Sequence, residues 1–440
     1  MNPLLVDLYE LTMGESYLAE GLDERPATFE LFCRTLPPGF GYLIAAGIDD
    51  ALDYLEQLRF GDDDLAYLET TGLFSVDFLG HLDGLRFRCD VRAMPEGTIF
   101  FPDEPVLEVT GPLLEAQLVE TALVNLVHFQ SLIASRAARC VDAAGGRRLV
   151  EFGLRRTHGL ETGPYVARAS YLAGFDATSD VLAGKRWGIP LAGTMAHSYI
   201  EAFEDETSAF DAYTRSYPVG TTLLVDTYDT VEGARRAARV AAELVGRGGH
   251  LGGVRLDSGD LDELSRRVRV VLDEAGLPDV SIFASGNLDE HSIGALVASG
   301  APIDSFGVGT RLAVSDGATY FDLVYKLVDF DSRPVLKLSS DKATLPGSKQ
   351  VWRRTEEGCF AGDLVTLADE EPSWTGESLL APAMESGRRL SPASLETARE
   401  RAAAQRGMLS AAHRALEAEP YPVEISTGVE ELRRSALAAL

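Results

Sequence analysis

The feature that most constrains this 440-residue chain is a unit that recurs from about residue 146. Each unit holds an apolar, strand-like run, then a polar cluster containing glycine, and usually then a helical stretch. The runs begin roughly every 20–45 residues, an interval typical of repeated βα units in a barrel. We therefore expect parallel strands in RRLVEFGLRR, IPLAGTMAHS, TTLLVDTYDT, LGGVRLDSGD, VSIFASGNLD and IDSFGVGTRL, with convincing helices in VEGARRAARVAAELV and LDELSRRVRVVLDEA.

The polar clusters share one position, because each follows the carboxyl end of its predicted strand. In an α/β barrel these ends converge on one mouth, where active sites are built. Six such clusters in succession are hard to explain as turns alone. The pairs concerned are Arg155 and Arg156, His197 and Ser198, Asp226 and Asp229, Arg255 and Asp257, Ser285 and Asn287, and Gly309 and Thr310.

The rest of the chain divides around this repeat. Residues 1–115 hold short alternating segments that predict an N-terminal α+β domain. Residues 116–340 form the predicted barrel domain with the active site, and helical spacing over 113–144 predicts one long helix leading into it. Residues 341–440 are expected to form a C-terminal extension that packs back on the first domain, with a strand at KQVWRR and a long helix over 391–419.

Charge and cysteine content exclude several classes of partner. The formal net charge of −28 repels nucleic acid and anionic membranes. No apolar run reaches the roughly 18 residues of a spanning helix, and the acidic N-terminus lacks the pattern of a signal peptide, so we expect a cytoplasmic protein. The four cysteines (Cys33, Cys89, Cys140 and Cys359) have no metal-ligand spacing, which argues for reduced thiols and against structural zinc.

Lysine is scarce and unevenly distributed. The chain has five lysines, and four of them, Lys326, Lys337, Lys342 and Lys349, fall in one short window. The alternatives are a solvated loop and a local positive site for anions. We favour the anion site, since phosphate groups require paired positive charge.

Two of the clusters suit a phosphorylated sugar. FGVGTRL ends a strand in glycines whose bare backbone N–H groups can approach a phosphate, although a plain turn has the same pattern. In RLDSGDL, Arg255 suits phosphate oxygens, and Asp257 suits hydroxyl groups or Mg²⁺. Asp260 is expected to cap the following helix instead. Asp226 is a candidate metal or sugar contact.

Two further clusters suit a planar anion and a phosphoryl group. In EFGLRR, Arg155 could clamp a carboxylate while the Phe152 ring stacks on a planar substrate; the alternative is a surface arginine pair. His197 follows GTMA in a predicted strand end. A lone histidine is more often structural than catalytic, but the spacing here leaves both roles open.

Taken together, the chain resembles the nicotinate phosphoribosyltransferases from LLVDLYELTM near the start to TLPGSKQVWR near residue 350. The resemblance is carried by an ordered set of motifs: EFGLRR, GFDATSDVLAG, GTMAHS, VDTYDT, VRLDSGDL and FGVGTRL. It implies an irregular, incomplete α/β barrel of the type II phosphoribosyltransferases, an N-terminal α+β domain with a C-terminal helical extension, and a homodimer with shared active sites.

The implied reaction joins nicotinate to 5-phosphoribosyl 1-diphosphate, coupled to ATP hydrolysis and dependent on Mg²⁺, and yields nicotinate mononucleotide for NAD salvage. By the resemblance, His197 is the histidine that ATP phosphorylates. Tyr9, donated by the other subunit, and Phe152 clamp the pyridine ring, and Arg155 lies near the ring. Asp226, Arg255 and Asp257 contact the sugar diphosphate and metal, with both aspartates as metal ligands, and Ser285, Gly286, Gly309 and Thr310 cradle the product phosphate.

The choice between nicotinate and its amide is expected to depend on Ser179. The related nicotinamide enzyme carries an aspartate at the position that Ser179 matches. A hydroxyl donates to a carboxylate, whereas an aspartate repels it, so nicotinate is favoured. The alternatives are a nicotinamide-type or quinolinate-type transferase and a non-catalytic sugar-phosphate sensor. Intact His197 and Asp226 argue against the sensor.

Overall fold

The computed structural model describes residues 2–338, 344–390 and 392–439 and divides the chain into two compact units. The first comprises Met1–Ser135 and Tyr320–Leu440, and the second Arg136–Thr319. These limits differ from the predicted boundaries at 115 and 340. Helix α6 (Glu120–Ala144) contributes to both units, and β12 (Leu323–Phe330) pairs with β1 (Pro26–Cys33) of the first unit.

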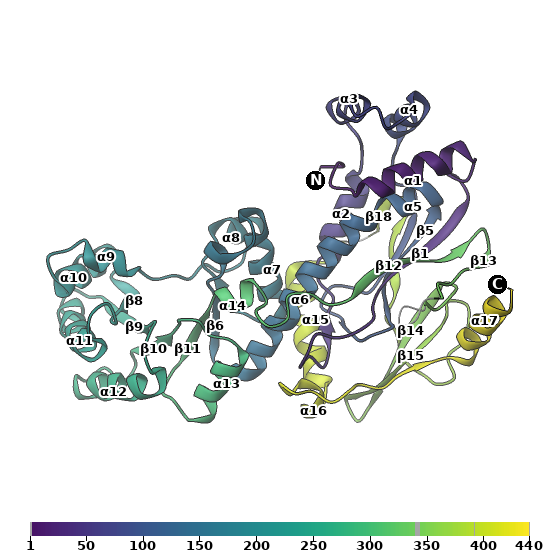
Figure 1. Ribbon diagram of the computed structural model, residues 1–440. Helices are drawn as coiled ribbons and strands as arrows, with labels where there is room; N and C mark the ends of the chain where they lie inside the picture. The colour runs from purple at the N-terminus through teal and green to yellow at the C-terminus, as the bar shows by residue number, and fades with distance from the viewer. Residues whose placement is uncertain (1, 339–343, 391, 440) are drawn as a thin grey trace. The chain divides into compact units, whose positions relative to one another are not determined.

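The first unit is built on a seven-stranded antiparallel sheet of order β13-β12-β1-β5-β3-β17-β18 (Figure 1). β1 lies inside this sheet, and every residue of the strand except Pro26 is buried. The other strands are β5 (Pro105–Pro112), β3 (Asp90–Ala93), β13 (Arg333–Pro334), β17 (Ala381–Glu385) and β18 (Arg388–Arg389), and a separate pair joins β2 (Leu43–Ile44) to β4 (Ile99–Phe100).

Helices of the first unit come largely from the start of the chain. The single helix predicted over 113–144 is wrong, because a turn at Val119 (φ −100°, ψ 0°) separates α5 (Leu113–Leu118) from α6. The others are α1 (Leu8–Ala19), α2 (Ile48–Gln57), α3 (Asp62–Thr70) and α4 (Val76–Gly84).

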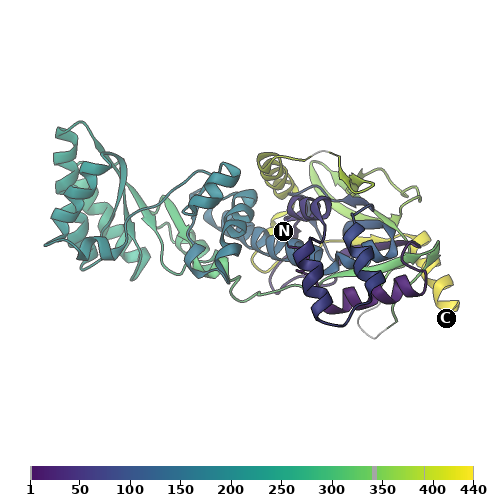
Figure 2. The same ribbon diagram turned by 90° about the horizontal axis from the view of Figure 1, so that it is seen from above.

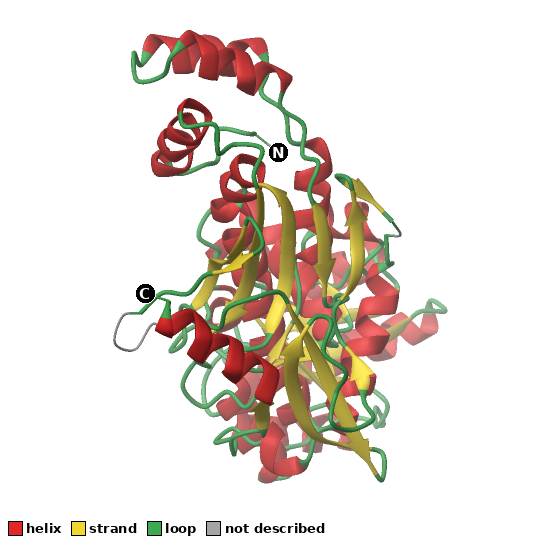
Figure 3. Ribbon diagram, turned by 90° about the vertical axis from the view of Figure 1, so that its right-hand side faces the viewer, coloured by secondary structure: helices red, strands yellow, loops and turns green. Residues whose placement is uncertain are grey.

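The C-terminal residues add a four-stranded sheet of order β16-β14-β15-β19 to the first unit (Figure 3). The predicted strand at KQVWRR is β14 (Lys349–Glu356), and α17 (Thr427–Ala438) contacts β15 (Cys359–Leu367). The long helix predicted over 391–419 is shorter: α15 (Leu395–Met408) is capped by Ser394 and ends where Leu409 turns extended. The remaining elements are β16 (Glu377–Ser378), α16 (Ala411–Arg414) and β19 (Val423–Ile425).

Two of the clustered lysines are held in ion pairs within the first unit. Lys349 Nζ lies 2.8 Å from Glu30 Oε2, and both side chains are almost fully buried. Lys326 Nζ lies 3.1 Å from Glu120 Oε1. The predicted anion site is therefore wrong for these two lysines, because carboxylates already compensate their charge. Lys337 is exposed, and Lys342 lies outside the described residues.

The second unit is an open, six-stranded parallel sheet of order β7-β6-β11-β10-β9-β8, which confirms the predicted incomplete α/β barrel. In Figure 2 the teal helices of residues 206–274 lie together on one side of the strands. The strands are β6 (Arg148–Glu151), β7 (Ala177–Thr178), β8 (Val219–Leu224), β9 (His250–Leu256), β10 (Ser281–Ala284) and β11 (Ser305–Val308).

Aspartates begin the main helices of this sheet. The side chains of Asp229, Asp260 and Asp289 accept hydrogen bonds from the first turns of α11, α12 and α13, so the predicted capping role of Asp260 is confirmed. The helices are α7 (Gly163–Ala173), α8 (Val181–Trp187), α9 (His197–Glu201), α10 (Glu206–Ser216), α11 (Thr230–Gly246), α12 (Leu261–Glu274), α13 (Glu290–Ala298) and α14 (Thr310–Ala313), with 3₁₀ turns η1 (Leu154–Arg156) and η2 (Leu160–Thr162).

Five of the six predicted strands are present, and the run IPLAGTMAHS is the exception. It is extended but makes only an isolated bridge, between Leu191 and Thr178. The short strand β7, which the sequence analysis missed, takes the edge position beside β6. No helix in the described part of the chain is long and apolar enough to cross a membrane.

Candidate active site

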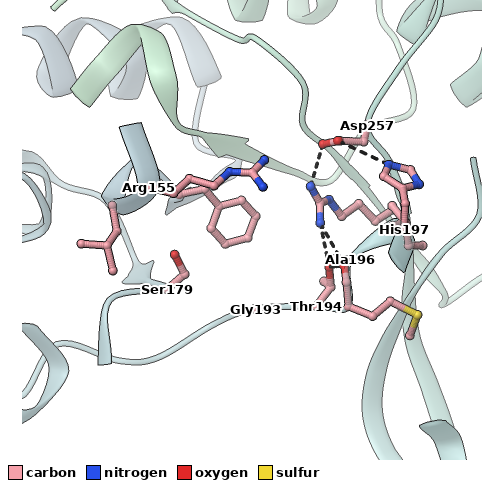
Figure 4. Close-up of a pocket in the computed structure, with 12 residues that line it drawn as sticks. Arg155, Ser179, Gly193, Thr194, Ala196, His197 and Asp257 are labelled. Carbon is pink, nitrogen blue, oxygen red and sulfur yellow. Dashed lines mark hydrogen bonds and ion pairs between the residues drawn. The ribbon is translucent and has the colours of Figure 1, made fainter. Parts of the chain in front are cut away.

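The carboxyl ends of the parallel strands surround a cavity of about 350 Å³ in the second unit. Figure 4 shows Arg155 and Ser179 at one end, His197 and Asp257 at the other, and the extended segment from Gly193 to Ala196 running between them. The lining residues are Phe152, Leu154, Arg155, Ser179, Gly193, Thr194, Met195, Ala196, His197, Leu224, Arg255 and Asp257.

Arg255 is fixed at one end of the cavity by a dense set of hydrogen bonds. Its Nη2 donates to Asp257 Oδ1 at 2.6 Å, and its Nε donates to Ser285 Oγ at 2.8 Å. Nη1 donates to Thr194 Oγ1 at 2.9 Å. Since the guanidinium is always charged and is held in one orientation, this end presents a fixed positive group.

Asp257 stays ionised beside this arginine. Burial raises the pKa of Asp257, but hydrogen bonds from Ser285 and Arg255 and the nearby positive charge outweigh burial and leave the pKa below its ordinary value. Ser285 Oγ donates to Asp257 Oδ1 at 2.5 Å. The buried hydroxyl of Ser285 therefore joins the arginine to the carboxylate.

Asp226 lies behind this pair, and its carboxylate is only half satisfied. Its Oδ2 accepts from the backbone N–H of Asp257 at 3.0 Å and from Ser258 Oγ at 2.6 Å. Its Oδ1 is buried without a hydrogen-bond partner. A buried anionic oxygen without a partner is costly, and a cation would satisfy it.

Within the described residues, no group of three or more acidic, histidine or cysteine side chains could hold a metal ion. The carboxylates of Asp226 and Asp257 nevertheless fit Mg²⁺, which typically takes one or two carboxylates and completes its shell with water and substrate phosphates; the backbone N–H of Asp257 donates to Asp226 and ties the two residues together. The donor set of Asp226 and Asp257 thus suits a hard cation that arrives with a phosphorylated substrate.

His197 is placed by a helix rather than by a strand. It is the first residue of the short helix α9, so its predicted place at a strand end is wrong, because the preceding run forms no strand. Its Nδ1 lies 3.1 Å from Thr227 Oγ1, and its Nε2 lies 3.7 Å from Asp257 Oδ2. Side chains from two neighbouring strand ends thus face the two ring nitrogens.

The Phe152 ring lies in the cavity wall because Gly307 leaves room for it. A Cβ atom at Gly307 would lie 2.8 Å from the rings of both Phe152 and Phe283. The Arg255 guanidinium carbon lies 5.6 Å from the centre of the Phe152 ring. One face of this apolar wall thus meets the fixed cation.

Arg155 and Ser179 reach the far end from two different segments. Arg155 belongs to the 3₁₀ turn after β6, and Ser179 follows β7; both are exposed. Arg156 is also exposed but does not line the cavity. The two arginines therefore differ, although the sequence shows them as a pair.

Six of the predicted residues do not line the cavity wall, and Asp226, which lies behind Arg255 and Asp257, is one of them. Ser285 is buried within the Arg255 network. Gly286 has φ +100°, and a Cβ there would lie 1.9 Å from the Asp257 carbonyl oxygen, so glycine is required for the two strand ends to approach. Gly309 precedes the four-residue helix α14, which Thr310 begins. Tyr9 belongs to α1 of the first unit, where 43% of the residue is exposed.

The sequence analysis missed several residues of this site. Thr194 and Met195 line the cavity and accept hydrogen bonds from Arg255, and Thr227 contacts His197. Thr194 and Met195 lie three and two residues before His197, and Thr227 follows Asp226. Their closeness to predicted site residues in the sequence was the available signal.

Comparison with known proteins defines the class of this molecule. Residues 133–323 match the model of the quinolinate phosphoribosyl transferase C-terminal domain, and residues 4–128 match that of the nicotinate phosphoribosyltransferase N-terminal domain. The fold and its strand-end cavity are therefore those of a phosphoribosyltransferase with an incomplete α/β barrel.

The relatives narrow this class to one family. A nicotinate phosphoribosyltransferase of Mycobacterium tuberculosis is 49% identical over 97% of this chain and 92% of its own length, and that of Bacillus subtilis is 44% identical over 84% and 76%. The crystal structure of the human nicotinic acid enzyme superposes with a TM-score of 0.87 at 32% identity, covering 98% of this chain and 99% of that one. The chain belongs to the nicotinate phosphoribosyltransferase family.

Proposed function

We propose that this enzyme condenses nicotinate with 5-phosphoribosyl 1-diphosphate to give nicotinate mononucleotide and diphosphate, in an ATP-coupled step of NAD salvage. The observation that carries the proposal is the division of the cavity. One end offers an exposed arginine and a hydroxyl beside an aromatic ring. The other offers a fixed arginine, the Asp257 carboxylate and a histidine, with Asp226 buried directly behind them.

The first end suits a pyridine carboxylate. Phe152 offers a ring face for stacking, Arg155 offers a positive partner for a carboxylate, and the Ser179 hydroxyl can donate a hydrogen bond. No acidic side chain is among the residues that line the cavity at this end. An anionic ring substrate is therefore favoured over its neutral amide.

The second end suits a sugar diphosphate with Mg²⁺. Asp226 and Asp257 would hold the cation, which neutralises diphosphate charge when bound. Arg255 binds phosphate oxygens, and the carboxylates face the positive charge that develops on the ribose carbon as diphosphate leaves. The ring nitrogen of nicotinate needs only to be positioned in line.

ATP coupling is assigned to His197. A structural histidine would be expected to bond a backbone carbonyl of the barrel, but the Nδ1 partner is the Thr227 hydroxyl. An imidazole nitrogen accepts a phosphoryl group when it is unprotonated, and Arg255 with Mg²⁺ at this end suits the γ-phosphate. A phosphorylated His197 would add negative charge beside the metal site and so favour the bound cation.

Tyr9 is assigned to the cavity of a second subunit in a homodimer. In its own chain it lines a different pocket, with Glu120 and His128, in the first unit. If active sites are shared, Tyr9→Ala and His197→Asn subunits, each of which lacks ATP-stimulated activity, should regain it when mixed, because one of the two sites in a mixed dimer is intact. Absence of activity from a proven mixed dimer would exclude sharing.

Product formation from three pyridines tests the reaction. The native enzyme is incubated with phosphoribosyl diphosphate and Mg²⁺, with and without ATP, and with nicotinate, nicotinamide or quinolinate in turn. We expect ATP-stimulated nicotinate mononucleotide and little product from the other two. Preferred use of nicotinamide or quinolinate would reassign the enzyme, and no turnover of phosphoribosyl diphosphate would favour a binding protein.

A further inference from the structure

A buried glutamate at the end of β6 connects the two segments that form the ring-binding end of the cavity. Glu151 is 1% exposed and does not line the cavity. It directly precedes Phe152 and the turn that carries Arg155. None of the roles assigned above uses this carboxyl group.

Each oxygen of Glu151 bonds a different segment. Oε1 accepts from the backbone N–H of Gly153, at the start of the Arg155 turn. Oε2 pairs with the Thr178 hydroxyl at 2.6 Å, directly before Ser179. The carboxyl group is therefore a bridge between the segment that presents the cation and the segment that presents the hydroxyl.

The bridge extends beyond Thr178. The hydroxyl of Thr178 also accepts from the Asp180 N–H at 2.9 Å. The backbone of Thr178 bonds the extended segment on its other side, since Ala192 N–H donates to Thr178 O at 3.0 Å. That segment continues directly into Gly193 and Thr194 of the cavity wall.

Gly153 permits the contact. A Cβ atom at this position would lie 2.7 Å from Glu151 Oε1 and 2.6 Å from the Ala313 side chain. Any larger residue would push the carboxyl group away from the amide. The glycine and the glutamate of this motif are thus matched to each other.

The bridge does not depend on the charge of the carboxyl group. Burial raises the pKa of Glu151 to about 7, against the hydrogen bonds from Thr178 and Gly153, so both protonation states occur at neutral pH. In the ionised state both oxygens accept. In the protonated state Oε2–H donates to the Thr178 hydroxyl instead, and the same two segments stay joined.

We propose that Glu151 is a positioning residue for the pyridine carboxylate, whose bridge from the Gly153 amide to the Thr178 hydroxyl sets the separation of the Arg155 and Ser179 walls. This inference rests on the proposed function and deepens it. Glu151 touches neither the substrate nor the reacting atoms. Its loss should weaken capture of the ring acid and leave the sugar-diphosphate end, built on β8 to β10, intact.

Paired substitutions at both ends of the bridge test this role. Glu151→Leu and Thr178→Val remove the bridge with little change in volume. Glu151→Gln and Thr178→Ser keep it, because the Gln amide accepts from Gly153 and donates to Thr178. Thr214→Val is the matched control: Thr214 is buried in the same unit and bonds the Asp211 carbonyl, outside the cavity wall.

Two measurements are made on each folded variant. We expect Glu151→Leu and Thr178→Val to raise KM for nicotinate about tenfold while kcat and KM for phosphoribosyl diphosphate change less than about twofold. The retaining variants and the control should stay within about twofold of the native enzyme. Amide hydrogen exchange should rise in peptides covering 152–156 and 176–180 in the bridge-breaking variants only.

The two measurements separate the possible failures. Unchanged exchange in Glu151→Leu and Thr178→Val would overturn the bridge. Faster exchange with an unchanged KM for nicotinate, or an equal loss in all kinetic constants, would leave a structural role and overturn the positioning role. A native enzyme that does not use nicotinate would refute the proposed function, whereas hydrogen exchange would still decide on the bridge.

Discussion

His197 Nε2 lies 3.7 Å from Asp257 Oδ2, while the other oxygen of Asp257 is held by Arg255 and Ser285. One carboxylate therefore faces both the fixed cation and the imidazole. Because the pKa of Asp257 is lowered, the carboxylate remains charged at neutral pH. It therefore favours the His197 tautomer in which Nε2 carries the proton.

Replacement of His197 by asparagine should abolish ATP stimulation without unfolding the protein. Asparagine roughly keeps the size and can still bond Thr227, but it has no nitrogen that accepts a phosphoryl group. We expect acid-labile label from γ-labelled ATP on the native protein and none on the variant, which should retain at most slow ATP-independent turnover. The control is His158→Asn, an exposed histidine of the same unit. Normal ATP stimulation in folded His197→Asn would show that another residue is the acceptor.

Replacement of Arg155 by alanine should lower kcat/KM for nicotinate, and the loss should correspond to several kcal/mol of transition-state stabilisation. Hydrogen bonds to charged groups contribute roughly 1.5–3 kcal/mol each, and a carboxylate takes two from one guanidinium. Steady-state kinetics with Arg156→Ala as the control give the comparison, since Arg156 does not line the cavity. Equal losses in the two variants would mean that Arg155 and Arg156 both act only through their general surface charge.

A charged side chain at Ser179 should change substrate choice. Ser179→Asp places a carboxylate beside the position proposed for the nicotinate carboxylate, and like charges repel. The ratio of kcat/KM for nicotinate to that for nicotinamide should fall at least about tenfold, whereas Ser179→Asn should lower it less. An unchanged ratio in Ser179→Asp, or native turnover of nicotinamide equal to that of nicotinate, would contradict this assignment.

Mg²⁺ should be required, and Asp226 should set the concentration needed. Asp226→Asn removes the charge of the buried oxygen that lacks a partner, so half-maximal activity should need about tenfold more Mg²⁺. Asp229→Asn is the control, because Asp229 caps α11. Elemental analysis should find no stoichiometric zinc. Equal Mg²⁺ requirements in the two variants would place the cation elsewhere.

Replacement of Lys349 by methionine should destabilise the first unit by about 3–5 kcal/mol at pH 8, because it leaves Glu30 buried without its counter-charge. Lys326→Met, which breaks a more exposed pair, should cost less than about 1 kcal/mol. Urea unfolding gives both free energies.

The effect of Lys349→Met should also depend on pH. Burial raises the pKa of Glu30 from its ordinary value of about 4.5 to about 7, although Lys349 opposes the change. The contribution of protonated Glu30 to the free energy of unfolding is fully present below the unfolded pKa of about 4.5. This contribution is lost as the pH rises through the folded pKa of about 7. Without Lys349 the folded pKa of Glu30 should lie higher still. The loss of unfolding free energy caused by Lys349→Met should therefore be larger at pH 8 than at pH 5.5. A deficit that is the same at both values would argue that the pair is neutral in the native protein.

The sequence predicted the strands of the barrel well, because five of them carry an apolar run followed by a polar end. It failed at residues 189–195, where an apolar run is extended but makes only an isolated bridge, between Leu191 and Thr178, instead of a strand. A short apolar run reports burial but does not by itself show that the segment joins a sheet. His197 was therefore singled out correctly as a cavity residue but assigned to the wrong element.

The contacts between segments could not be predicted from one sequence. Asp226 and Asp257 were both candidates, yet the hydrogen bond from the Asp257 amide to Asp226 depends on the register of neighbouring strands. The prediction of an anion site from the clustered lysines failed for the same reason. Four lysines are close in the chain, but β1 and α6 supply carboxylates that pair two of them, and these partners lie about 200 or more residues away in the sequence.

The vacant side-chain position at Gly307 has a consequence for how the enzyme tolerates change. The Phe152 ring can occupy the cavity wall because residue 307 contributes no atoms beyond its backbone. The position of the ring therefore depends on the absence of a side chain at 307. Every single amino-acid replacement at 307 adds at least one carbon where two aromatic rings already touch. In a saturation library this position should be among the least permissive of the barrel, although residue 307 makes no side-chain contact of its own.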